Sequence, residues 1–418
     1  MYYKKISSQV ILFFFSLFIL QSCSDDSLSP VTAGISGKVL GSGNNPLPNL
    51  KVKIGEQSTV TNSTGDFTLN NISLPYDILI IDEQSKSQAL FKSVSISNII
   101  IPEFYSFKNP DYTCYLKINI PTEFIQSGKK GKLIFTNGYD INSSIDITSE
   151  GTSLDIKMTE FKRVMGKLII LIYRTDNNGN ILSYENYCEI NDIEILPNRL
   201  LYYNINSTQL SLNPSERNIT GKISIPSGYN TGLQYFYLNF ASKNSSFNNP
   251  ECKFSSINGN DFNFVVPVNL PTEFSILVNN YITDNDKYCL ETFKIPENTN
   301  GINLQAKLPA DIISPADNST DINSNSVISH TAGSGSGVFI TRFFKNDGYI
   351  CSIVNTSESF LFSEVSKFEI TNINNSYFFW SVEKHGEISN VNEYLNSFPR
   401  NSDRFVSKSQ QRTFRTAH

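Results

Sequence analysis

The chain is poor in the residues that build most catalytic and metal sites. Its 418 residues include only three His, one Trp and three Met, and only 17% of them are charged. His330, His385 and His418 are scattered, which leaves little basis for a His-rich metal centre. No Gly-x-Ser-x-Gly, P-loop or Gly-x-Gly-x-x-Gly motif occurs in a strand–turn–helix context. These absences predict that the chain is not an enzyme and holds no cofactor or metal.

Apolar and aromatic residues are abundant enough to exclude global disorder. They make up 39% and 12% of the chain, which is sufficient for packed cores. The length fits three or four domains of roughly 100–150 residues each. Beyond the N-terminal segment, apolar residues alternate with polar ones at period two, and no long amphipathic helical period occurs. The sequence therefore predicts an all-β chain of tandem β-sandwich domains.

The first 22 residues have the pattern of a secretory signal peptide. Lys4 and Lys5 precede an apolar run from Val10 to Leu20. A helix of this length spans about 16 Å, which is too short to cross a bilayer. We therefore expect residues 1–22 to be removed on export.

The residues that follow indicate an anchor. Leu20-Gln21-Ser22-Cys23 resembles the lipobox of bacterial lipoproteins, which implies cleavage before Cys23 and acylation of its thiol. Several acyl chains, at about 0.8 kcal/mol per buried CH₂, anchor a protein stably. Ser24-Asp25-Asp26 resembles the acidic export signal of Bacteroidetes lipoproteins, which implies the outer face of the outer membrane. The alternative is a solvated acidic start of a tether, which we place at residues 23–33.

Charge and cysteine content narrow the partners. Removal of residues 1–22 takes away two Lys and no acid, so the net charge changes from −5 to −7. An acidic chain without a basic stripe argues against nucleic acid as a partner. Five further cysteines are present, and an odd number cannot all pair internally. Cys114–Cys188 and Cys252–Cys289 are possible disulfides in an oxidising compartment. Otherwise these residues and Cys351 are small buried side chains in strands.

Residues 34–105 carry the clearest domain motif. Alternating patterns predict strands at residues 35–40, 51–54, 57–62, 67–69 and 77–81. Gly37-Lys38-Val39, the segment from Pro46 to Val52, and the segment from Thr61 to Phe67 resemble the carboxypeptidase regulatory-like (transthyretin-like) domain. That resemblance implies a seven-stranded sandwich with a tight turn at Gly65 and a core-facing Phe67. His385-Gly386-Glu387 lacks the His-x-x-Glu spacing of a zinc carboxypeptidase, so the enzyme of that family is not expected here.

Three further domains are expected behind it. Residues 106–215 and 216–310 share recurring segments about 105 residues apart, which suggests a duplicated β-sandwich, although biased strand composition could also produce the likeness. Residues 311–418 resemble a fibronectin type III-like domain, with Asn346-Asp347-Gly348 as a hairpin turn. In that family a Tyr at the strand corner bonds back to the backbone, and Tyr377 is the candidate for it. Val391 to Ser402 forms an insertion before the last strand.

Two kinds of side-chain cluster are candidates for a catalytic or binding site. Asp284 with Asp286, and Asp176 with Asn178 and Asn180, could serve glycoside cleavage or weak Ca²⁺ binding, but solvated turns explain both better. Three aromatic runs could stack on sugars, whereas alternation in a strand places one residue of each pair in the core. These runs are Tyr202-Tyr203, Tyr235-Phe236-Tyr237 and Phe343-Phe344.

These observations lead to a functional hypothesis. We expect a non-enzymatic, lipid-anchored envelope protein with four β-sandwiches in a row, whose surface binds a partner, in the sharpest version a glycan. The alternative is a structural or adhesion protein that binds another envelope protein. A glycan-binding role predicts exposed paired aromatic residues on one domain, whereas protein binding predicts apolar patches or open strand edges. An enzyme with an unrecognised site is the third hypothesis.

The outward location is testable on intact cells. External protease should remove the mature protein while the envelope remains sealed, and Cys23→Ala should release the chain from the membrane fraction because no lipid is attached. Immunoblotting of intact and lysed cells measures both effects. Survival of the protein until lysis would instead place it on the periplasmic side.

Overall fold

The computed structural model describes residues 32–41, 46–102, 104, 112–126, 128–137, 141–158, 163–240, 252–256, 259–296, 299–396 and 405–417. The predicted signal peptide, Cys23 and nearly all of the tether lie outside these ranges. Strands account for most of the described residues, so the prediction of an all-β chain is confirmed. Within the same ranges, no helix has the length and apolar character needed to cross a membrane.

The first unit, residues 32–104, forms two facing sheets. One has the strand order β4-β1-β7 and the other contains β3-β2-β5-β6. The five predicted strands coincide with observed ones, and that at residues 51–54 has the same bounds. The strands are β1 (Thr32–Val39), β2 (Lys51–Ile54), β3 (Gln57–Val60), β4 (Asp66–Ser73), β5 (Tyr76–Asp82), β6 (Ser87–Val94) and β7 (Asn98–Ile101).

The turn before β4 has the expected geometry. Gly65 has φ +74°, and a Cβ there would lie 2.7 Å from the carbonyl oxygen of Val39. The Asn62 side chain accepts hydrogen bonds from the backbone N–H groups of Thr64 and Asp66. Phe67 then enters the core with 4% exposure. Only Gly tolerates both the left-handed conformation and the close backbone approach.

The second unit (residues 112–212) and the third (residues 215–310) repeat one strand order. The second has β10-β9-β12-β13 facing β11-β8-β14, and the third has β17-β16-β19-β20 facing β18-β15-β21. The first unit has the same order, which the sequence comparison did not detect. The second unit contains β8 (Tyr112–Asn119), η2 (Thr122–Phe124), β9 (Lys129–Thr136), β10 (Asn142–Ile147), β11 (Gly151–Met158), β12 (Val164–Thr175), β13 (Ile181–Ile195) and β14 (Leu200–Asn204). The third contains β15 (Ser215–Ser224), β16 (Asn230–Asn239), β17 (Cys252–Ser256), β18 (Asp261–Val268), β19 (Ser275–Asp284), β20 (Lys287–Ile295) and β21 (Ile302–Gln305).

The fourth unit, residues 312–417, has a different order. Its sheet β22-β24-β27 faces strands β25, β26, β28 and β30. The hairpin turn forms as predicted, with Gly348 at φ +94°. Its elements are β22 (Ile312–Ser314), β23 (Ser319–Ile322), β24 (Val327–His330), β25 (Gly337–Lys345), β26 (Ile350–Asn355), β27 (Ser359–Leu361), η3 (Phe362–Lys367), β28 (Tyr377–Gly386), α2 (Val391–Asn396), β29 (Phe405–Lys408) and β30 (Arg412–Thr416).

One expectation for this unit is wrong. Tyr377 is 51% exposed, and its ring lies beneath the Arg415 guanidinium instead of in a buried corner. Tyr377 is the first residue of β28, and its side chain lies on the face of the strand opposite to that of Trp380, which is fully buried. Alternation along the strand therefore directs Tyr377 toward solvent.

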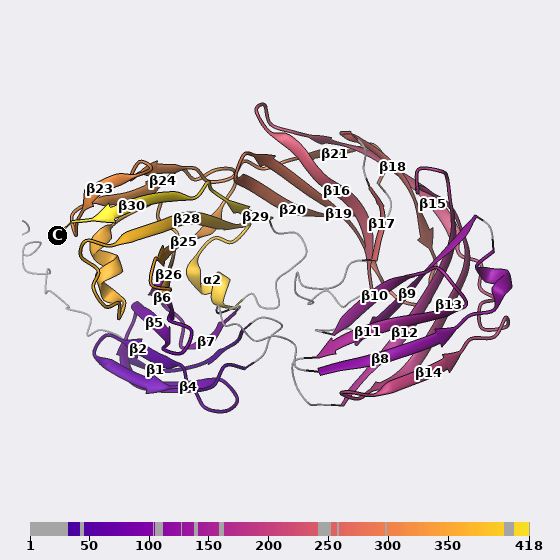
Figure 1. The fold of residues 1–418 in the computed structure, drawn as a ribbon, viewed down its shortest axis with the longest axis horizontal. Helices are drawn as coiled ribbons and strands as arrows, with labels where there is room; N and C mark the ends of the chain where they lie inside the picture. Colours follow the sequence, from indigo (N-terminus) through magenta and orange to yellow (C-terminus); the bar gives the residue numbers. More distant parts are fainter. Residues whose placement is uncertain are drawn as a thin grey trace, which may run out of the picture.

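The four units are not arranged in a row. Strand β6 of the first unit pairs in parallel with β26 of the fourth, from Ser87 opposite Ile350 to Phe91 opposite Val354. Strand β29 joins β28 of the fourth unit to β20 of the third. A single sheet of 14 strands therefore runs through three units, and the chain returns to its beginning (Figure 1). The expectation of a linear series is corrected, because edge strands left open by one unit are paired by another.

The described part of the predicted insertion, residues 391–396, is helix α2. Asn390 caps it by accepting a hydrogen bond from the Glu393 backbone N–H. Its apolar side chains Val391, Tyr394 and Leu395 pack into the core of the first unit. The insertion is therefore a docking element that joins the two ends of the chain.

Ion pairs surround this junction. Glu369 contacts the ammonium groups of Lys51 and Lys53 at 3.0 and 2.8 Å, and Lys92 pairs with Glu364 at 2.6 Å. Because exposed pairs contribute about 0–1 kcal/mol each, most of the stabilisation comes from strand pairing and the buried face of α2.

A first prediction concerns α2. Leu395 is fully buried, so Leu395→Ala should lower the free energy of unfolding by about 2–5 kcal/mol. Asn396→Ala, at an exposed position of the same helix, should change it by less than about 0.5 kcal/mol. Chemical denaturation measures both values. Equal effects of the two substitutions would mean that α2 does not hold the junction.

The joint between the third and fourth units contains a buried carboxyl group. Glu291 of β20 is 2% exposed and lies opposite Phe405 of β29. It accepts hydrogen bonds from the Lys307 backbone N–H at 2.9 Å and from Asn280 at 3.4 Å. Burial raises its pKa to about 7, although the hydrogen bonds and the Lys307 charge oppose the increase.

A second prediction follows from this pKa. Since the folded chain holds the Glu291 proton up to about pH 7 and the unfolded chain releases it near 4.5, the stability that this group contributes should fall as pH rises between these values. The loss is on the order of 3 kcal/mol. Glu291→Gln should reduce this pH dependence in unfolding experiments from pH 4 to 8, whereas Glu56→Gln at an exposed site should retain it. An unchanged profile in Glu291→Gln would contradict the assignment.

Candidate functional site

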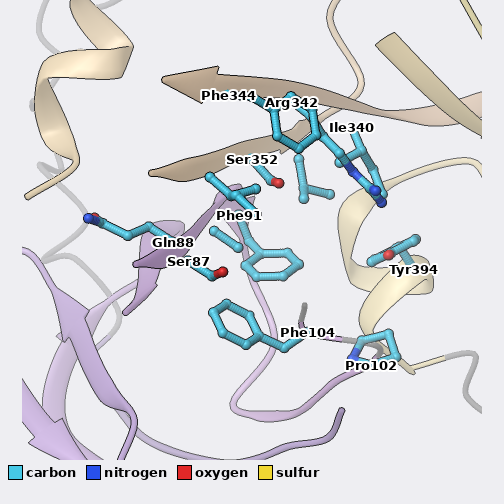
Figure 2. Close-up of a pocket in the computed structure, with 13 residues that line it drawn as sticks. Ser87, Gln88, Phe91, Pro102, Phe104, Ile340, Arg342, Phe344, Ser352 and Tyr394 are labelled. Carbon is cyan, nitrogen blue, oxygen red and sulfur yellow. The ribbon is translucent and has the colours of Figure 1, made fainter. Parts of the chain in front are cut away.

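A pocket lies where the first unit meets the fourth, on one face of the shared sheet (Figure 2). Its floor follows the register of three adjacent strands, β25, β26 and β6. Residues directly opposite one another point to the same face of a sheet. The floor rows are Phe344–Ile350–Ser87, Arg342–Ser352–Ala89 and Ile340–Val354–Phe91.

The walls also come from both units. Pro102 and Phe104 follow β7 of the first unit, and Tyr394 belongs to α2 of the fourth. Figure 2 shows Phe91 and Phe104 on the side of the first unit and Tyr394 beside the helix. The volume of the pocket is about 50 Å³. The pocket therefore exists only while the two units are docked.

Exposed aromatic rings continue from the pocket across the fourth unit. We call Tyr377, Phe379 and Phe344 the aromatic strip. Phe344 lines the pocket and lies directly opposite Phe379 on β28, which is 43% exposed. Tyr377 lies two residues before Phe379 on the same face, with the Arg415 guanidinium 5.3 Å from its ring centre. Phe344 thus belongs both to the pocket and to a row of rings that reaches solvent at Phe379 and Tyr377.

A few polar side chains line the pocket, among them Arg342 and Ser87. Arg342 Nη2 lies 3.2 Å from Glu383 Oε2, and His385 Nε2 lies 2.5 Å from Glu383 Oε1. Figure 2 shows the Arg342 guanidinium on the Tyr394 side of the pocket and the Ser87 hydroxyl on the other side. Ser87 is 2% exposed, and its hydroxyl oxygen has no hydrogen-bond partner among the described residues.

The aromatic runs selected from the sequence divide largely as alternation predicts. Phe343 is fully buried and stacks on Trp380 at 6.1 Å, whereas Phe344 faces the pocket. Phe236 is fully buried, but Tyr235 and Tyr237 pack on each other with centroids 5.9 Å apart, and Tyr237 is buried as well. This second run therefore offers no exposed platform. Phe379 and Ser87 were missed, because only strand register places Phe379 opposite Phe344 and Ser87 opposite Ile350.

A second exposed surface, the tyrosine face, lies on the sheet β11-β8-β14 of the second unit. Tyr202 is 62% exposed, Tyr115 is 47% exposed and Leu200 is 51% exposed. Leu200 lies opposite Tyr115, and Tyr202 lies opposite Lys117, so the two tyrosines are diagonal neighbours. The pocket between the first and fourth units does not include these residues among those that line it. This surface follows one face of a sheet and differs in kind from the pocket.

The carboxylate clusters weighed for catalysis or Ca²⁺ are occupied by their own turns. Asp176 accepts hydrogen bonds from the Asn178 and Asn180 backbone N–H groups and from the Asn180 side chain, and the Asn180 bonds lower its pKa. Asp284 accepts one from the Asn285 side chain. Among the residues that the structure describes, no three His, Cys, Asp or Glu side chains are grouped to hold a metal.

Four cysteines occupy core positions as free thiols: Cys114, Cys188, Cys289 and Cys351. The Cys114–Cys188 and Cys252–Cys289 disulfides considered from the sequence are therefore not formed. Burial raises the pKa of the Cys188 thiol to about 11, and it raises the pKa values of the other three as well. Thiols in this state are poor nucleophiles.

Comparisons with known proteins give only distant similarities. No protein-family model matches the chain, and no curated protein matches it. Among solved structures, the chain is similar to the Bacillus anthracis TIE protein, with 12% identity, a TM-score of 0.16 and coverage of 66% of this chain and 49% of the other. It thus spans about half of that protein.

Two further solved structures match. A tetra-tandem repeat from the extending region of a large adhesion protein has 8% identity and a TM-score of 0.18, with coverage of 92% of this chain and 99% of the other. BcpA, the major pilin subunit of Bacillus cereus, has 10% identity and a TM-score of 0.13, with coverage of 66% and 99%. At these TM-scores the similarities carry no information about ligand or activity, so function is argued from the surface of this chain.

Proposed function

We propose that this chain is a lipid-anchored, non-enzymatic protein of the cell envelope that binds glycans through the aromatic strip and the adjoining pocket. The observation that carries the proposal is the continuity of Tyr377, Phe379 and Phe344 with a pocket that contains directed polar groups. Sugar rings present apolar C–H faces that pack on exposed aromatic rings, and their hydroxyl groups require hydrogen-bond partners. The strip supplies the first, and Arg342 supplies the second.

The anchor and location rest on the N-terminal sequence. The lipobox at Cys23 attaches the chain to the outer membrane, and the acidic residues after it favour the outward face. A mature net charge of −7 argues against nucleic acid as the ligand.

The proposed family of each end is supported by strand order. The first unit combines β4-β1-β7 and β3-β2-β5-β6 with the Gly65 turn, as expected for a carboxypeptidase regulatory-like domain. The fourth unit opposes β22-β24-β27 to a sheet in which β25 lies between β26 and β28, as expected for a fibronectin type III-like domain. Neither family by itself specifies the ligand.

The tyrosine face favours a second candidate function, adhesion to another envelope protein. Tyr115, Tyr202 and Leu200 form a compact apolar area on one sheet face, and their rings resemble the aromatic anchors of protein interfaces. Sugar binding at a flat face would lack the enclosed polar groups that the pocket provides.

A third prediction separates the two functions. Phe379→Ala should weaken binding to a soluble surface polysaccharide about ten- to hundredfold, because the substitution removes a stacking ring worth roughly 1.5–3 kcal/mol. Tyr202→Ala removes a ring of similar exposure from the second unit and should leave the same affinity unchanged. Affinity electrophoresis on a panel of envelope polysaccharides measures both.

The opposite pattern would overturn the assignment. Loss of binding in Tyr202→Ala with full binding in Phe379→Ala would move the site to the tyrosine face. Binding that neither substitution affects would exclude both surfaces. Near-UV circular dichroism of each variant establishes that the fold is retained.

A further inference from the structure

The pocket is too small for a whole sugar ring. A volume of about 50 Å³ corresponds to roughly three to five water-sized atoms, at about 10–15 Å³ each. A substituent of a sugar fits this space, whereas the ring has to remain outside on the aromatic strip. The identity of that substituent can be argued from the groups inside the pocket.

Arg342 favours a carboxylate. Both of its contacts with Glu383 use Nη2, at 3.2 and 3.4 Å, while the guanidinium carries five N–H donors in a planar fork. Glu383 is itself shared with His385. A carboxylate of three heavy atoms matches both the volume of the pocket and the bidentate geometry of this fork.

The charge around the strip agrees with an anionic ligand. Arg342 lies at the pocket and Arg415 lies over Tyr377, so two guanidinium groups flank the strip, and Glu383 pairs with the first of them. The chain as a whole has a net charge of −5. The two guanidinium groups at the strip therefore carry the opposite sign to the net charge of the chain.

We infer that the ligand is an acidic glycan, whose uronate ring stacks on Phe344 and Phe379 while its carboxylate enters the pocket and binds Arg342. This inference rests on the proposed function, because it specifies the glycan bound at the same site.

The test compares acidic and neutral forms of one set of sugars. The full mature chain in detergent micelles is titrated with an array of uronate-containing oligosaccharides and with their methyl esters, which keep the ring and remove the charge. We expect the esters to bind at least tenfold more weakly, since a charge-assisted hydrogen bond is lost. Affinity for the acids should also fall with added salt.

Variants assign the effect to one residue. Arg342→Gln should remove the preference for acids over esters, and Arg342→Lys should retain part of it because the charge remains without the fork. Arg174→Gln is the matched control, since Arg174 also pairs with a glutamate, Glu185, but lies in the second unit. It should leave the preference intact, and thermal unfolding establishes that each variant is folded.

Each outcome is decisive. Equal binding of acids and esters, lost in Phe379→Ala, would overturn the acidic-glycan inference and leave the proposed function standing. Preference for acids that persists in Arg342→Gln would also overturn it. Absence of binding to every sugar in the array would overturn both.

Discussion

The parallel pairing of β6 with β26 is the constraint on which the rest of the structure depends. Five residues of each strand are in register, from Ser87 opposite Ile350 to Phe91 opposite Val354. The pairing satisfies the backbone groups of two edges that would otherwise be open. It also joins segments more than 250 residues apart, so the entropy of closing a very long loop is offset by one extended interface. Helix α2 seals that interface with apolar side chains.

The candidate site is a consequence of this closure. Its floor spans strands from both ends of the chain, and its walls come from the segment after β7 and from α2. Neither unit alone forms the pocket, which agrees with the general tendency of ligand sites to lie between domains. The polar groups of the pocket come from both units. The Ser87 hydroxyl of the first unit has no hydrogen-bond partner among the described residues, and Glu383 positions Arg342 in the fourth unit.

Three units repeat one strand order, and this repetition explains where the chain can be extended. In the first and third units, the last strand of the larger sheet, β6 or β20, pairs with a strand of the fourth unit. In the second unit the equivalent strand, β13, is covered by the connection to the third unit. Glu216 accepts a hydrogen bond from the Tyr184 N–H, and the Leu212 carbonyl accepts one from the Tyr187 N–H. The equivalent edge strand is thus paired with β26 in the first unit, with β29 in the third unit, and with the segment around Leu212 and Glu216 in the second.

Local patterns in the sequence were enough to predict the local features of the fold. Period-two alternation predicted the strands of the first unit, the Asn62–Phe67 segment predicted a turn that requires Gly65, and alternation required one residue of the Phe343-Phe344 pair to lie in the core. Only the tertiary structure decided which strand edges meet, that the insertion after β28 forms α2, and that Tyr377 is exposed. The physical reason is that alternation specifies the face of a residue but not its neighbour. Phe379, Arg342 and Ser87 become one site through long-range register, which no local pattern encodes.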